Sequence, residues 1–181
     1  MFSITQESAP EDALLKTYRG GVHPERWGGY GDCFSVRVEG AVSLQDFVFA
    51  FYTSPLFRIE RWLLRAFIGA PSSDRGARAL ADGSASSFAA WYVADRTATQ
   101  LLMCDRYERT RSWFRVSAAD GGGTLLQFGS AVAAGGRDRG TGAAAKGGGF
   151  RLLLRFHVLY SRLLLNGARN ALNRTRAKET A

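Results

Sequence analysis

The most constraining feature of this 181-residue chain is its closing segment, residues 150–173, which has the pattern of one long amphipathic helix. At helical spacing an apolar stripe falls on one face, formed by Leu153, His157, Tyr160, Leu164, Ala168 and Ala171. The opposite face is basic and polar, with Arg151, Arg155, Arg162, Asn166, Arg169 and Asn173, and we expect it to face water. An apolar stripe of this length needs a covering partner, and the strand-like block before it is the expected one.

That block is predicted to be an antiparallel meander, because short turns connect its strand candidates. The candidates are residues 87–94, 99–104, 109–117 and 124–132. Alternation in the third candidate places Thr110, Ser112, Phe114 and Val116 on one face. Arg109, Arg111, Trp113 and Arg115 share the other face, which we expect to look outward.

Upstream, residues 33–39 alternate as a first strand, and two helices are predicted at about 43–52 and 54–67. Ser43 and Asp46 have the spacing of a capping box, with Asp in place of Glu or Gln. Further short helices are predicted at 10–18 and 74–81. The fold class is therefore α+β, with an antiparallel β-sheet meander gripping a long C-terminal α-helix.

The predicted organisation is one main domain with short flanking segments. Residues 1–31 form an N-terminal helix and a Gly-rich loop, and residues 32–175 form the domain. Within it, residues 133–149 are Gly-Ala-rich and are interpreted as a mobile loop. Residues 176–181 form a polar tail.

This order of elements resembles the helix-grip fold of the START-like superfamily, which includes polyketide cyclases, plant allergens and lipid-transfer domains. The resemblance is carried by Asp32 to Glu39, the helix pair from Phe47 to Phe67, the meander from Ser87 to Val132, and Phe156-His157. It is one of topology, and the closing helix is also similar to those of uncharacterised bacterial members. The family pattern has more strands than the five expected here, and residues 69–86 would have to supply the others.

The resemblance implies a pocket between the sheet and the C-terminal helix that binds an apolar or amphipathic small molecule. Polar side chains on apolar strand faces would orient such a ligand, or would simply bond to buried neighbours. The expected ligand-binding residues are Thr110, Ser112, Phe114, Gln127, Leu153 and Leu164.

A second hypothesis is an enzyme. His157 and Tyr160 lie one turn apart on the apolar face, and an imidazole with a phenol could serve as an acid–base pair in a cyclase- or dehydratase-like reaction. The alternative is that both are core residues whose polar ends reach backbone groups. Asp32 and Glu60 are the best-placed acids, and both are interpreted as surface groups.

The net charge of +8 permits an anionic partner. A third hypothesis is therefore a non-catalytic interaction protein that docks an acidic partner on the Arg-Trp strand face. Binding of nucleic acid is not favoured, because the stacking aromatic pairs of such sheets are missing and Asp95, Asp105 and Glu108 offset the arginines.

The remaining composition predicts no cofactor and no metal site. Cys33 and Cys104 are interpreted as small buried residues rather than a disulfide or a reactive pair. His23 and His157 have no ligand spacing with them. No segment reaches the length of about 20 apolar residues that a bilayer requires, and the first ten residues are polar. We expect a cytoplasmic protein whose oligomeric state the sequence does not specify.

Overall fold

The computed structural model describes residues 3–21, 31–68, 72–133 and 148–179. Within these ranges, the side chains of residues 64, 67, 68, 148–157, 178 and 179 are not described. The predicted mobile loop at 133–149 therefore lies, apart from its ends, outside the described residues.

The centre of the fold is a seven-stranded antiparallel sheet in the order β1-β2-β7-β6-β5-β4-β3. Its strands are β1 (Thr5–Gln6), β2 (Gly31–Val38), β3 (Ser87–Phe88), β4 (Trp91–Arg96), β5 (Gln100–Asp105), β6 (Thr110–Ala118) and β7 (Thr124–Val132). Strands β4 to β7 form the predicted meander, and β2 joins it at the outer edge of β7.

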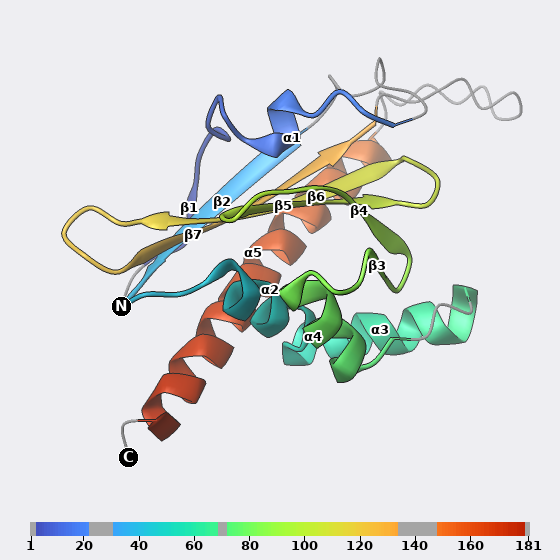
Figure 1. The fold of residues 1–181 in the computed structure, drawn as a ribbon. Helices are drawn as coiled ribbons and strands as arrows, with labels where there is room; N and C mark the ends of the chain where they lie inside the picture. Colours follow the sequence, from blue (N-terminus) through green and yellow to red (C-terminus); the bar gives the residue numbers. More distant parts are fainter. Residues whose placement is uncertain (1–2, 22–30, 69–71, 134–147, 180–181) are drawn as a thin grey trace, which may run out of the picture.

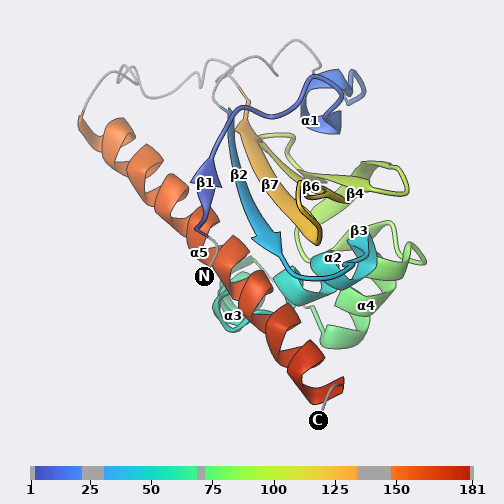
Figure 2. The same cartoon turned by 90° about the vertical axis from the view of Figure 1, so that its left-hand side faces the viewer.

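Helices cover both faces of this sheet unequally (Figures 1 and 2). They are α1 (Leu14–Thr17), α2 (Leu44–Tyr52), α3 (Pro55–Ile68), α4 (Asp74–Asp82) and α5 (Gly148–Glu179). Figure 1 shows α2 to α5 on one side of the sheet and the short α1 on the other. The long α5 contacts α2, α3, β2 and β7. The predicted α+β class, with an antiparallel sheet and a long C-terminal helix, is confirmed.

The expected number of five strands is wrong, because two short strands extend the sheet at its edges. Residues 5–6 form β1, and the first meander candidate divides at Ala89 (φ 52°) into β3 and β4. Residues 72–86 supply no strand. Ser73 caps α4 by accepting a hydrogen bond from the Gly76 N–H, and Gly83 ends it with φ 86°.

The main core lies between the sheet and the helices α2 to α5, and it is rich in aromatic rings. Phe51 of α2 is at its centre, with ring centroids 4.8 Å from Phe114 and 4.7 Å from Phe128. Phe114 and Phe128 are opposite each other in register on β6 and β7. On α5 the buried apolar side chains are Leu164, Leu165, Ala168 and Leu172. The buried arc of α5 is wider than the predicted stripe, because α5 packs against both α2 and the sheet.

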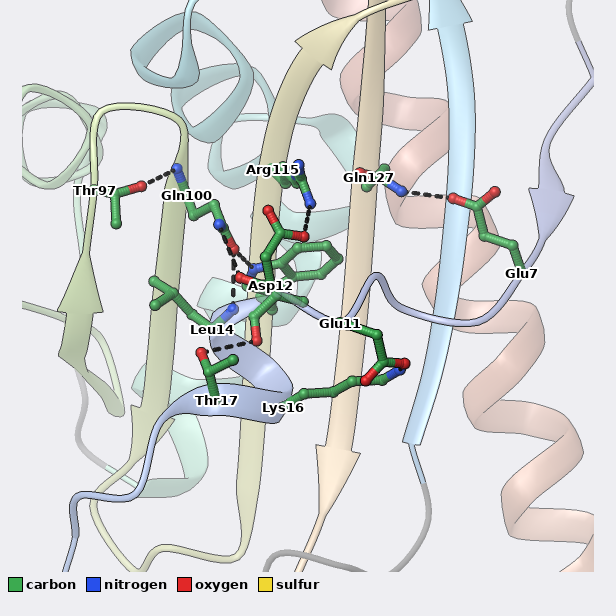
Figure 3. Close-up of polar contacts among 12 residues, drawn as sticks. Glu7, Glu11, Asp12, Leu14, Lys16, Thr17, Thr97, Gln100, Arg115 and Gln127 are labelled. Carbon is green, nitrogen blue, oxygen red and sulfur yellow. Dashed lines mark hydrogen bonds and ion pairs between the residues drawn. The ribbon is translucent and has the colours of Figure 1, made fainter.

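A second, smaller core covers the opposite face of the sheet. Residues 7–18, here called the N-terminal cover, pack there on a completely buried Trp113. The side-chain carbonyl oxygen of Gln100 accepts hydrogen bonds from the Leu14 N–H (3.0 Å) and the Trp113 indole (2.8 Å). Figure 3 shows this contact beside the ion pair of Asp12 with Arg115, at 2.8 Å.

The prediction that the Arg-Trp face of β6 looks outward is therefore wrong. Arg111 is 1% exposed, donates a hydrogen bond to the Gly20 carbonyl and lies 4.9 Å from the centre of the Tyr18 ring. Strand alternation separates two faces of a sheet, but it does not say whether a distant segment covers the second face. This face does not offer Trp113 to a partner.

Candidate functional site

A cavity of about 470 Å³ lies between the end of β2 and the C-terminal turns of α5. We call it the basic cavity, and its lining residues are Arg37, Val38, Glu39, Arg169, Asn170, Asn173 and Arg176. Three guanidinium groups and one carboxylate give this lining a charge of +2 (three minus one). The cavity therefore favours an anion over a cation.

The turn after β2 positions one wall of the basic cavity. Gly40 adopts φ 64°, and a Cβ at that position would lie 3.1 Å from the Arg176 guanidinium. The turn directs the Ala41 carbonyl toward α5, where Arg176 donates a hydrogen bond to it. On the sheet side, Arg37 donates to the Gly121 carbonyl in the β6–β7 turn, at 2.8 Å. Both guanidinium groups are thus anchored to backbone carbonyls.

Arg169 lines the basic cavity and is nine-tenths buried. Its guanidinium donates to the side-chain oxygen of Asn166, one turn earlier on α5. It also lies 3.5 Å from the side-chain oxygen of Asn170. Both of these acceptors are neutral amides in or beside the lining of the cavity, where a guanidinium can also donate to a phosphate or carboxylate group.

A second cavity, of about 250 Å³, lies on the other side of the same part of α5, against α2. Val42, Phe49, Ala50, Ala171 and Leu172 give it apolar walls. It also contains polar groups, which are Asp46, Thr53, Arg78, Thr175 and Arg176. Arg176 borders both cavities, so a basic space and a partly apolar space meet at one side chain.

The predicted ligand-binding residues of the sheet do not line either cavity. Phe114 and Leu164 are buried in the main core. Thr110 bonds through its N–H to the Asp105 carboxylate, at 2.6 Å. Ser112 lies on the helix side, where it is in register with Ser130 of β7 and Met103 of β5.

Gln127 lies on the opposite face of the sheet from Ser112 and Phe114. Its neighbours Leu126 and Phe128 point into the main core, and Gln127 donates instead to the Glu7 carboxylate at 2.7 Å (Figure 3). This contact belongs to the N-terminal cover. Gln127 therefore cannot share a helix-side pocket with the other predicted residues.

Asp32 is 5% exposed, so its interpretation as a surface group is wrong. It lies opposite Ser130 in the β2–β7 ladder. The Ser130 N–H (3.2 Å) and hydroxyl (2.6 Å) both donate to its carboxylate. Asp32, Ser130 and Ser112 thus follow one another across three neighbouring strands on the helix side.

Leu153 and His157 belong to α5, but their side chains are outside those that the structure describes. The roles assigned to them stay predictions. Tyr160 donates a hydrogen bond to the carboxylate of Glu60 on α3. Burial raises the pKa of Glu60 above its ordinary range, although the bond from Tyr160 opposes this rise. Burial, with the nearby Glu60 charge, also raises the pKa of Tyr160.

The raised pKa of Glu60 predicts a pH-dependent loss of stability. The folded state binds the Glu60 proton more tightly than the unfolded chain, so the contribution of Glu60 to the free energy of unfolding is fully present below the ordinary pKa of 4.5 and is lost as pH rises through the folded value. Glu60→Gln keeps an acceptor for Tyr160 without the charge. We expect it to flatten this fall in denaturant unfolding measured across pH. The exposed Glu39→Gln serves as control, and a parallel pH profile in Glu60→Gln and wild type would contradict the assignment.

The basic cavity was missed at the sequence level because Arg169, Asn173 and their neighbours fall on the face of α5 that was expected to meet water. The end of β2 lies against that face, so Arg169 is buried there. One signal in the sequence was available. On the polar face of the final helix, Asn166, Asn170 and Asn173 flank Arg169, whereas a solvated helix face usually carries Glu and Lys.

A scan against protein-family models, a search of curated proteins and a search of solved structures each gave no match to this chain. Among the described residues, no group of three or more His, Cys, Asp or Glu is placed to hold a metal ion. None of the helices in the described ranges combines the length and the apolar content needed to cross a bilayer.

Proposed function

We propose that this protein binds an amphipathic small molecule that carries an anionic group, with that group in the basic cavity between β2 and α5. The observation that carries the proposal is Arg169, a residue that is only 9% exposed and lines a cavity of about 470 Å³. This volume lies within the range of about 300–1,000 Å³ that is typical of small-molecule sites. A phosphate or carboxylate group fits the planar guanidinium donors there.

The amphipathic character of the ligand is inferred from the second cavity. Its walls from Val42, Phe49 and Leu172 would remove an alkyl or aryl portion from water. Because Arg176 borders both spaces, an anionic group beside it would leave the apolar portion directed toward α2. This is passive binding, in which apolar burial supplies affinity and the guanidinium groups fix orientation.

The test is calorimetric titration of the whole protein with dodecyl phosphate and with dodecanol, which has the same tail without the charge. We expect dodecyl phosphate to bind and dodecanol to bind more weakly. Arg169→Gln should weaken binding of dodecyl phosphate by about ten- to a hundred-fold, because a hydrogen bond to a charged group contributes about 1.5–3 kcal/mol.

The matched control is Arg174→Gln, which removes the same charge from an exposed position of α5 outside both cavities. It should leave the affinity almost unchanged. Equal losses in the two variants would show that general charge, rather than the basic cavity, attracts the ligand, and equal binding of dodecanol would remove the anionic group from the proposal.

A further inference from the structure

The described exposed apolar side chains gather on one surface of the helical layer. Six large apolar side chains are strongly exposed among those described, and five of them lie on α3 and α5. They are Ile59, Trp62 and Leu63 of α3 with Leu159 and Leu163 of α5, and we call them the α3/α5 apolar surface. Each is between 40% and 66% exposed.

On each helix these residues share one face, and the two faces lie beside the hydrogen bond between Tyr160 and Glu60. On α3 the spacing of Ile59, Trp62 and Leu63 is that of one helical face, opposite the buried Phe57 and Arg61. Tyr160 of α5 donates this hydrogen bond to the Glu60 carboxylate of α3, so it connects the two helices. Leu63 follows Glu60 by three residues, and Leu163 follows Tyr160 by three, so both leucines border that bond.

Basic residues flank both outer sides of this surface. Arg58 and Arg65 lie on the side of α3 away from Glu60, and Arg162 lies on the side of α5 away from Tyr160. All three are exposed. Arg58 shares Asp74 with the buried Arg61, so two guanidinium groups are balanced by one carboxylate there. The surroundings of the apolar surface are therefore cationic.

We infer that the α3/α5 apolar surface docks on an anionic lipid surface. A helix lying at a bilayer interface combines Trp and aliphatic residues on one face with arginines beside them, because the apolar face enters the headgroup boundary and the cations meet lipid phosphates. Trp62 supplies the interfacial aromatic residue. Charge selects this occupant over a second copy of the chain, since a two-fold dimer through this surface would bring the same arginines together.

The experiment is flotation of the intact protein with vesicles of phosphatidylcholine, alone or mixed with phosphatidylglycerol. We expect binding to the mixed vesicles that weakens with added salt. Trp62→Ala with Leu159→Ala should reduce this binding by about ten-fold or more, because the two substitutions remove apolar surface that would be buried in the bilayer. Tyr107→Ala is the matched control, because Tyr107 is the one strongly exposed large apolar side chain described outside this surface.

The charge is tested separately with Arg65→Gln and Arg162→Gln together. Each arginine near a lipid surface contributes a factor of about five, so loss of the pair should weaken binding to mixed vesicles about thirty-fold. Arg75→Gln with Arg174→Gln makes the same change of net charge at exposed positions outside the surface. All these sites are exposed, so melting curves should stay close to that of the wild type.

Equal binding to neutral and mixed vesicles, or no binding to either, would overturn the inference. So would a concentration-dependent dimer in light scattering that Trp62→Ala dissociates, because the surface would then be a self-association interface. These readouts do not depend on Arg169, so the outcome is separate from that of the dodecyl phosphate titration.

Discussion

Phe51→Ala should lower the free energy of unfolding by about 3–5 kcal/mol, which is a large part of the stability of a typical domain. The Phe51 ring lies within 6.4 Å, centre to centre, of five other aromatic rings, those of Phe47, Tyr52, Phe57, Phe114 and Phe128. Alanine would leave a cavity between α2, β6 and β7 that these rings cannot fill without leaving their present packing. Denaturant unfolding followed by circular dichroism measures the loss.

The matched control for Phe51→Ala is Phe49→Ala on the same helix. Phe49 is only partly buried, and its ring packs under the Arg78 guanidinium, 3.6 Å from the ring centre. Phe49→Ala should lower the free energy of unfolding clearly less than Phe51→Ala does. Similar losses in the two variants would show that Phe51 is not the centre of the aromatic core.

Gln100→Ala should destabilise the protein by about 2–5 kcal/mol, because two buried donors lose their acceptor at once. The Leu14 N–H and the Trp113 indole N–H both donate to the Gln100 side-chain oxygen. We expect the N-terminal cover to loosen, so the indole proton of Trp113 should exchange with solvent faster in NMR experiments.

Gln45→Ala is the control, since it makes the same change at an exposed position of α2. It should leave both stability and indole exchange unchanged. Loss of stability in Gln100→Ala without faster exchange at Trp113 would mean that the cover is held by its other contacts, such as the ion pair of Asp12 with Arg115.

Local signals in the sequence predict most of the elements correctly. Ser43 caps α2 as expected, with its hydroxyl accepting a hydrogen bond from the Asp46 N–H. The strand expected at 124–132 is β7, and the long final helix is α5. In each case the pattern lies within one segment, so neighbouring residues contain the information.

The features that the sequence did not predict depend on contacts between distant segments. Trp113 and Arg111 alternate as an exposed strand face, and only the placement of residues 7–18 on that face buries them. Arg169 has the helical position of a solvated residue, and the end of β2 changes its environment. The spacing of residues within one segment does not show whether a distant segment packs on it.

The basic cavity is lined by residues other than those that the sequence led us to expect. A cavity lies between the sheet and the C-terminal helix, but α5 contributes Arg169, Asn173 and Arg176 to it rather than the expected apolar stripe. Leu164 and Ala168 of that stripe are instead buried in the main core with the aromatic side chains of α2 and the sheet.

The N-terminal cover also bears on the order in which the molecule is assembled. Its polar contacts join residues 86, 103 and 120 positions apart, through Leu14, Asp12 and Glu7 respectively. During synthesis most of the surface on which this early segment packs is missing until β5, β6 and β7 have been made and paired. Such long-range closure slows folding, and until it occurs Trp113 stays open to other chains.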